Sequence, residues 1–359
     1  MLVHICCSVD SHFFLQKLQA LEPNEPLIGF FYDPNIHPFR EYELRLLDVK
    51  RSCAKLGIDL HVGSYNYEGW MDAVRGLEEE PEKGKRCVVC FDNRLEETAQ
   101  KALEIGEKRI TTTLLTSPKK SFEQLASSLG EIAQKYGLEM LAPDFRKAGG
   151  TQEQFTLAKK EQLYHQDYCG CLFALSKQRE AQHRWKDELS TPLRPQVLPS
   201  SIEERLFLYA KVMEQEALGV EVTLVRESFL NYRLLRAWVQ NAQAHVIPSY
   251  ILFYSHFKKE TLKGKIDAIH NEIGFFNRES IRFVTLKTFN TRMHTSYQNV
   301  SDMLYNPPEV DCEMAFRQSL FPGTFPSLNP IIVLDSLELG AYELYALSQT
   351  YHDIREILV

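Results

Sequence analysis

The first part of the chain alternates short apolar runs with stretches whose apolar residues recur at helical spacing. The runs predicted as strands cover residues 2–5, 27–32, 58–62, 109–115 and 140–142. The predicted helices cover residues 11–21, 39–56, 94–105 and 121–137, and three of them end at a glycine. Strands that alternate with helices in this way predict an α/β fold with a mostly parallel, doubly wound, Rossmann-type sheet.

A proline-rich stretch interrupts this pattern and predicts a domain boundary. We expect a first domain at residues 1–185, a linker at 186–200 and a second, accessory domain at 201–359. At this length, two domains of ordinary size are the simplest division of the chain.

The pattern of the second domain is weaker. Ser201 and Glu204 predict a capping box that opens a helix. Apolar runs at 246–254, 281–284 and 331–334 predict strands, and a helix is expected from Leu339 onward. We therefore expect an α/β or α+β extension, and its sequence indicates no function.

The composition is that of an ordinary globular protein, with 44% hydrophobic and 25% charged residues. No apolar run approaches the roughly 20 residues that cross a bilayer, and the first residues lack the basic start of a signal peptide. We therefore expect a cytoplasmic protein without a membrane partner. The net charge of −7 argues against nonspecific binding of polyanions, although a shaped basic pocket stays compatible with it.

Six of the eight cysteines occur in three tight clusters within the first half of the chain. A cytosolic chain seldom carries structural disulfides, so such clusters indicate metal or redox chemistry. The first two clusters, Cys6-Cys7 and Cys87-Val-Val-Cys90, offer four thiolates, which suit an iron–sulfur cluster or a structural zinc. Adjacent cysteines are unusual for structural zinc, but the residue types alone leave both interpretations open.

Two further features extend this chemistry. Asp10 follows the first cluster and is either an oxygen ligand for a second metal ion or the N-cap of a helix. Cys169-Gly-Cys171 is the third cluster, and so close a pair on a glycine-bearing loop favours a readily reduced disulfide with a redox role. Additional metal ligands or two free thiols are the alternatives for this pair.

Polar and aromatic residues near predicted strand ends are candidates for binding a nucleic acid and for proton transfer. Arginine and lysine bind phosphate, and aromatic rings stack on unpaired bases. The candidates for substrate binding are Tyr32, Arg40, Arg146 and Lys147, to which Lys119, Lys120, Lys159 and Lys160 add charge. His37, Tyr42 or a bound water is the candidate proton donor.

Six segments, in this order along residues 4–171, resemble the epoxyqueuosine reductase QueH family. They read HICCSVDS, YDPNIHPFREYELR, CVVCFDNRLEETAQKA, TTTLLTSP, DFRKAGG and YCGC. The resemblance covers the first half of the chain and is far more specific than a single CxxC motif. Where many members of the family read CCAP, this chain reads Cys6-Cys7-Ser8-Val9.

The resemblance implies an oxidoreductase that converts epoxyqueuosine to queuosine in the anticodon of tRNAs for tyrosine, histidine, asparagine and aspartate. It implies that Cys6, Cys7, Cys87 and Cys90 hold a [4Fe–4S] cluster and that Asp10 lies at an adjacent iron. Cys169 and Cys171 match the family's CxC pair. An electron donor such as a ferredoxin or flavodoxin is expected as a partner.

The segment CCSVDS also occupies the place of the glycine-rich SGGxDS phosphate loop of ATP pyrophosphatases. This likeness favours a HUP-like fold in which an ATP site has become a metal site. Two alternatives remain at this point: a tRNA-thiolating ATP pyrophosphatase, and a zinc-stapled tRNA-binding protein without catalytic activity.

Overall fold

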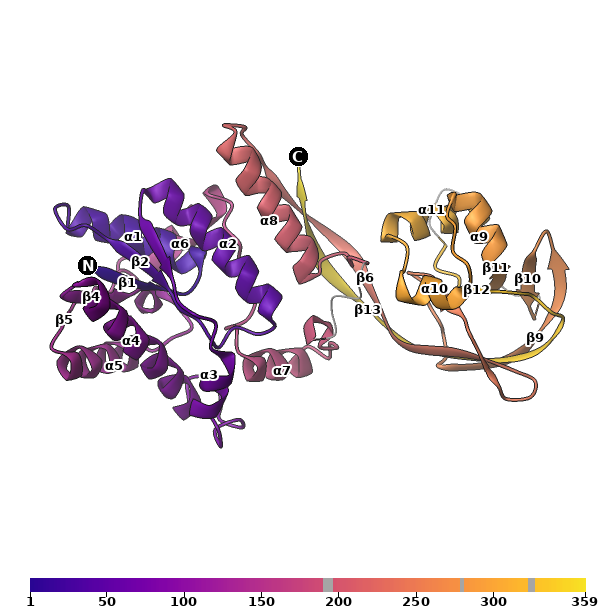
Figure 1. Ribbon diagram of the computed structural model, residues 1–359, viewed down its shortest axis with the longest axis horizontal. Coiled ribbons are helices and arrows are strands. Elements are labelled where there is room, and N and C mark those ends of the chain that lie inside the picture. The colour runs from indigo at the N-terminus through magenta and orange to yellow at the C-terminus, as the bar shows by residue number, and fades with distance from the viewer. Residues whose placement is uncertain (190–195, 278–280, 322–326) are drawn as a thin grey trace. The chain divides into compact units, whose positions relative to one another are not determined.

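The computed structural model describes residues 1–189, 196–277, 281–321 and 327–359 (Figure 1). The chain forms two compact units. Unit 1 contains residues 1–183, 205–225 and 357–359, and unit 2 contains residues 184–204 and 226–356. Within the described residues, no helix combines the length and the apolar character that a membrane span needs.

Unit 1 is built on a parallel sheet of five strands in the order β3-β2-β1-β4-β5, which confirms the expected α/β fold (Figure 1). Every strand pair is parallel, and Val3 of β1 lies opposite Gly29 of β2 and Thr111 of β4. The strands are β1 (Leu2–Ile5), β2 (Ile28–Phe31), β3 (Asp59–Val62), β4 (Arg109–Thr112) and β5 (Glu139–Met140).

Helices cover both faces of this sheet because β1 is apolar on both faces. Val3 and Ile5 pack in one cluster with Phe14 of helix α1, whereas Leu2 packs with Leu95 of helix α4 on the other face. The helices assigned mainly to unit 1 are α1 (Ser8–Leu21), α2 (Phe39–Leu56), α3 (Tyr67–Ala73), α4 (Lys85–Ile105), α5 (Phe122–Tyr136), α6 (Gly150–Lys160), α7 (Leu172–Ala181) and α8 (Ile202–Ala217).

Two predicted boundaries in unit 1 were wrong. Helix α4 begins at Lys85 and not at residue 94, so the CxxC motif lies within the helix and not before it. Strand β4 ends at Thr112, where the side chain accepts a hydrogen bond from the Leu114 amide and starts the 3-10 turn η1 (Thr113–Thr116). The expected capping box at Ser121 is present, since its hydroxyl accepts from the Gln124 amide at 3.3 Å.

Unit 2 contains most of an eight-stranded sheet in the order β7-β6-β13-β9-β10-β11-β12-β8. The strands are β6 (Leu224–Asn241), β7 (Val246–Ile247), β8 (Tyr250–Ile251), β9 (Thr261–His270), β10 (Ile273–Phe276), β11 (Arg282–Thr285), β12 (Ile331–Leu334) and β13 (Gly340–Leu358). The helices are α9 (Leu286–Met293), α10 (Val300–Tyr305) and α11 (Val310–Leu320), with a 3-10 turn η2 (Asp187–Leu189).

The helix expected from Leu339 is the strand β13 instead. Leu344 and Ala346 are buried in the core, whereas Glu343 and Tyr345, which alternate with them, are partly exposed. This alternation has the period of two that belongs to a strand, and it outweighs the spacing that resembled a helix.

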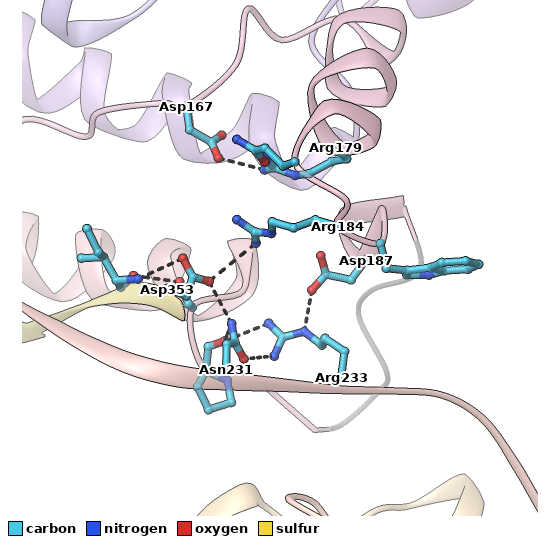
Figure 2. Close-up of polar contacts among 12 residues, drawn as sticks. Asp167, Arg179, Arg184, Asp187, Asn231, Arg233 and Asp353 are labelled. Atoms are coloured by element: carbon cyan, nitrogen blue, oxygen red, sulfur yellow. Dashed lines mark hydrogen bonds and ion pairs between the residues drawn. The ribbon is translucent and has the colours of Figure 1, made fainter. Parts of the chain in front are cut away.

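The expected linker at residues 186–200 lies partly outside the described residues, at 190–195, and the domain boundary stays a prediction. Its described part packs within unit 2, where Arg233 Nε donates to Asp187 at 2.5 Å (Figure 2). Asp353 of β13 accepts from Asn231 Nδ2 at 2.9 Å and lies 3.7 Å from the Arg184 guanidinium (Figure 2). These contacts fix the first part of β6 beside β13.

Candidate metal and redox site

The candidate site lies beyond the carboxyl ends of β1 and β4. These two strands are neighbours in the sheet, and the strand order reverses between them, which is where ligands bind in doubly wound folds. Cys6 and Cys7 directly follow β1, and η1 directly follows β4. The Cys6 thiol lies 3.9 Å from the Thr113 hydroxyl, so the two strand ends meet as the sequence predicts.

Cys6, Cys7 and Asp10 form a buried group that is able to hold a metal ion. Their candidate ligand atoms all lie within 4.8 Å of one another, with 3.7 Å between the two thiols and 3.9 Å from Cys6 Sγ to Asp10 Oδ2. Burial raises the pKa of Asp10, although hydrogen bonds from Cys7 and Gln154 oppose the shift. The Gln154 amide donates to Asp10 Oδ1 at 2.7 Å and fixes the carboxylate.

The N-cap interpretation of Asp10 was wrong. Helix α1 begins at Ser8, its N-cap position is Cys7, and Asp10 lies in the first turn. The partial positive charge of the first turn favours anionic side chains, including thiolates and carboxylates. The start of the helix therefore suits the metal-ligand interpretation of Cys7 and Asp10.

Cys87 and Cys90 lie on the first turns of α4, three residues apart and therefore on one face of the helix. Both are buried, and burial raises the pKa of Cys90. The backbone amide of Lys83 donates to Cys87 Sγ at 3.3 Å. A small cavity joins Cys87 and Cys90 to Cys169 and Cys171, so the second and third cysteine clusters meet in space.

The loop that carries Cys169 and Cys171 is tightly held. Gly170 has φ +115°, and a Cβ atom there would lie 3.0 Å from Ile36 and 3.2 Å from the Arg45 guanidinium. Arg45 donates to the carbonyls of Tyr168 at 3.0 Å and Cys169 at 3.2 Å. Only glycine suits this position, and the hydrogen bonds set the direction of the Cys169 side chain.

Lys120 is the basic partner of Cys169. Its ammonium lies 2.8 Å from Cys169 Sγ, and the side chain is buried. Burial alone would raise the pKa of the Cys169 thiol, but the charges of Lys120, Arg94 and Arg45 hold it below its ordinary value. Burial and the neighbouring Cys169 raise the pKa of Cys171 to about 12. The pair is therefore asymmetric: Cys169 favours the thiolate and Cys171 the neutral thiol.

Arg94 and Asp33 form a buried ion pair beside the cysteines. Burial raises the pKa of Asp33 to about 6, although Arg94 opposes the shift. A cavity of about 100 Å³ lies between residues 6–10 and the loops of Lys120 and Cys169, whereas Cys87, Cys90 and Cys171 line the smaller cavity. The chemically active residues in its lining are Cys6, Asp10, Asp33, Arg94, Lys120 and Cys169.

Most of the residues expected to bind substrate or move protons lie outside this cavity. Tyr32 was a wrong expectation, because its ring is buried and stacks on Phe30 within the core. His37 stacks on Tyr67 at 4.8 Å, burial lowers its pKa, and it does not line the cavity. Arg40 pairs with Glu43 at 2.7 Å and keeps 40% of its side chain exposed.

The two basic residues of the DFRKAGG segment have different environments. Arg146 donates to the Lys120 carbonyl at 3.1 Å and to Asp144, so it holds the Lys120 loop. Lys147 is 81% exposed and lies 3.6 Å from Asp144. The sequence did not indicate that Lys120 contacts Cys169, because Lys120 was expected only to add charge for substrate binding, together with Lys119, Lys159 and Lys160.

Comparison with known proteins identifies the family of this chain. The family model for epoxyqueuosine reductase QueH matches residues 1–177. A protein named epoxyqueuosine reductase QueH from Helicobacter pylori is 40% identical over 347 residues, which is 93% of this chain and 94% of that protein. The protein of the same name from Thermotoga maritima is 36% identical over 182 residues, which is 50% of this chain and 92% of that protein.

Among solved structures, the U34-tRNA thiolase NcsA from Methanococcus maripaludis, with its [4Fe-4S] cluster, matches with a TM-score of 0.32 and 15% identity. The match covers 60% of this chain and 72% of the thiolase. The similarity to the Helicobacter pylori protein, by contrast, extends through both units of the chain. The chain therefore belongs to the epoxyqueuosine reductase QueH family.

Proposed function

We propose that this protein reduces epoxyqueuosine to queuosine in the anticodon of tRNA. The observation that carries the proposal is the meeting of three cysteine clusters and Asp10 around two adjoining cavities, in a chain that matches a reductase over nearly its full length. Tyrosine, histidine, asparagine and aspartate tRNAs are the proposed substrates. Arg40 and Lys147, whose side chains are partly or largely exposed, are the proposed phosphate contacts.

Cys6, Cys7, Cys87 and Cys90 are the proposed ligands of a [4Fe–4S] cluster. A single tetrahedral zinc at about 2.3 Å from each sulfur holds its thiolates about 3.8 Å apart. Among the described residues, only Cys6, Cys7 and Asp10 form so compact a group, and Cys87 and Cys90 lie outside it. Cys87 and Cys90 therefore do not complete a four-thiolate zinc site with Cys6 and Cys7 in this structure, and four buried thiols are the usual ligand set of a [4Fe–4S] cluster.

Asp10 is the proposed ligand of an additional iron next to the cluster. Its carboxylate is a hard oxygen donor, it lies 3.9 Å from the Cys6 thiol, and it lines the cavity. When bound, such a group supplies electrons and Lewis acidity. The fixed carboxylate and the buried thiols fit this group in charge and in ligand type.

The CxC pair is proposed to be redox-active. Conversion of an epoxide to an alkene consumes two electrons and two protons and releases one water. A Cys169–Cys171 dithiol provides both electrons when it forms a disulfide. One proton comes from the Cys171 thiol and the other from the Lys120 ammonium, which lies against the Cys169 thiolate. Electrons from a carrier such as a ferredoxin or flavodoxin then restore the dithiol.

The ATP pyrophosphatase alternative has little support from the residues at the strand end. The phosphate loop of those enzymes needs glycines so that backbone N–H groups surround the phosphate. Here the positions of the two glycines hold Cys7 and Ser8, whose side chains are buried.

The metal content of protein purified without oxygen tests the proposal. About four to five irons and four sulfides per chain would support the cluster with its iron. One zinc without sulfide would contradict it. The iron-loaded protein should then convert epoxyqueuosine in tRNA to queuosine, as measured by mass spectrometry of the nucleosides, and absence of conversion would refute the proposed function.

A further inference from the structure

One face of the sheet in unit 2 carries a stack of aromatic and cationic side chains. The rings of Trp238 on β6 and Tyr345 on β13 stack at 4.0 Å between centroids and 17° between planes. The Arg236 guanidinium lies over Trp238 at 4.7 Å and within 5.9 Å of Tyr345. Arg236 is exposed and both rings are partly exposed, so the stack is open to solvent.

The register of β13 with β9 places lysines on the same face. Tyr345 lies opposite Thr261 and Glu343 lies opposite Lys263, whereas Leu344 between them lies opposite Leu262 and faces the core. Successive side chains on a strand point to opposite faces, so Lys263 and Lys265 share the face of Tyr345. Lys263 is 75% exposed and lies 3.0 Å from Glu343.

Positive charge is concentrated on this part of the chain. On this face Arg236, Lys263 and Lys265 outnumber Glu343, although the whole chain has a net charge of −7. Lys258 and Lys259, just before β9, are also exposed. The local charge therefore complements a polyanion, which the overall composition does not indicate.

We propose that this aromatic–basic face, formed by Arg236, Trp238, Tyr345, Lys263 and Lys265, binds an unpaired stretch of tRNA. The choice of tRNA rests on the proposed function. Unpaired bases stack on aromatic rings and on guanidinium planes, and their phosphates pair with nearby lysines. Tyr345 packs on one face of Trp238, and the three distances place the Arg236 guanidinium beside this pair, at about a right angle to the line between the ring centroids. In this proposal a base stacks on an outer ring face of the pair, next to the guanidinium.

The direct test is the affinity of the full-length protein for an unmodified tRNA transcript, measured by filter binding over a range of salt concentrations. We expect Tyr345→Leu and Arg236→Gln each to weaken binding about tenfold. Arg236→Gln should also lower the slope of log affinity against log salt by about one, as expected for one lost phosphate contact. Lys263→Gln should have a smaller effect of the same kind, because Glu343 already neutralises part of its charge.

Arg226→Gln is the matched control. Arg226 is also an exposed arginine on β6, but it lies ten residues before Arg236, which is about 33 Å along the strand. Equal losses of affinity in Arg226→Gln and Arg236→Gln, or unchanged affinity in Tyr345→Leu, would overturn the proposal. So would equal affinity for a fully paired RNA duplex, since a duplex offers no bases for stacking.

Binding and reduction are separate readouts in this design. A protein that binds tRNA through the aromatic–basic face without reducing epoxyqueuosine would refute the proposed function and support the inference. Reduction with the same KM in wild type, Tyr345→Leu and Arg236→Gln would overturn the inference and leave the proposed function intact. Thermal unfolding of each variant identifies any loss that comes from misfolding.

Discussion

The ammonium of Lys120 and the thiol of Cys169 are 2.8 Å apart, although 49 positions separate them in the chain. The contact depends on two loops. Arg146 holds the loop of Lys120 through its carbonyl, and Arg45 holds the loop of Cys169 through two carbonyls. The two thiols of the CxC pair consequently differ in acidity, and this difference is the basis of the first prediction.

Lys120→Met should slow the alkylation of Cys169 by iodoacetamide at pH 7. Without the lysine charge, burial dominates, the pKa of the Cys169 thiol rises, and the reactive thiolate becomes rarer. A rise of one unit slows the reaction about tenfold. Mass spectrometry of the reduced protein measures the rate at each cysteine. Lys120→Arg keeps the positive charge and should largely restore the alkylation rate of Cys169. The half-buried Cys312 of unit 2 should react at the same rate in all variants. Equal rates at Cys169 in wild type and Lys120→Met would contradict the prediction.

Gly170→Ala should lower turnover more than it lowers iron content. The added Cβ meets Ile36 and Arg45 at a positive φ, and strain of this kind costs about 1–3 kcal/mol. The expected displacement of Cys169 affects the redox pair and leaves the four proposed cluster ligands in place. Gly76→Ala is the control, since it has φ +83° and open space around the site of the added atom. Iron analysis and steady-state rates of both variants check the prediction, and equal loss of rate in the two would refute it.

Cys87→Ser should lose most of the iron and sulfide together with the activity, because it removes one of the four proposed thiolate ligands. Asp10→Asn should retain the sulfide and lose about one iron, because the amide is a weaker ligand for iron than the carboxylate. Elemental analysis after purification without oxygen distinguishes the two losses. Cys53→Ala is the control, since Cys53 is a buried thiol of α2 outside the site. Full iron content in Cys87→Ser would refute its assignment as a ligand.

The stability of unit 2 should fall as pH rises from about 4.5 to 7. Burial raises the pKa of Glu313 from 4.5 to about 7, so in this range the folded state binds more protons than the unfolded state. The change is at most about 3 kcal/mol at 1.36 kcal/mol per pKa unit. Urea unfolding across this pH range measures it.

Glu313→Gln should flatten this dependence, so that the difference in stability between pH 5 and pH 7 becomes smaller than in wild type. The Tyr250 hydroxyl and the Gln196 amide donate to Glu313 Oε1, and the Phe253 backbone amide donates to Oε2. The single oxygen of a glutamine replaces only one of these two acceptors, so Glu313→Gln should also lower the stability by an amount that does not depend on pH. Glu309→Gln at the start of the same helix is the control, because Glu309 is exposed. An identical pH profile for Glu313→Gln and wild type would contradict the assignment.

The sequence was sufficient for the parts of the site that lie at strand ends. The segments CCSVDS and TLLTSP lie at the ends of two predicted parallel strands and are therefore expected to converge, and Cys6 and Thr113 lie 3.9 Å apart although 107 positions separate them. The partnership of Lys120 with Cys169 was not predictable, because it depends on how two loops pack and leaves no periodic signal. Tyr32 was misjudged for a related reason. It was expected at the end of the strand predicted over residues 27–32, where a side chain is able to reach a ligand, but its ring is buried and stacks on Phe30.

In unit 2, the two long strands β6 and β13 were the hardest to predict from the pattern of apolar residues. Around Trp238 and Tyr345, apolar and charged residues occur at both odd and even positions, so the alternation that identifies a strand is obscured. Large apolar side chains are found on the solvent-exposed face of this sheet as well as on the buried face. The strand β12, by contrast, was predicted with its exact bounds, since all four of its residues are buried. Burial on both faces gives a continuous apolar run, which is the clearest strand signal in a sequence.

The chain passes between its two compact units four times, near residues 184, 205, 226 and 357. No single cut of the backbone therefore divides the protein into two intact bodies. A protease that cuts the chain at one of these four boundaries produces two fragments. At least one of them contains segments of both units. Deletion from residue 186 onward likewise removes α8, whose Glu216 pairs with the buried Arg51 of α2. To express either unit alone, its separate segments must be joined by new loops or by circular permutation.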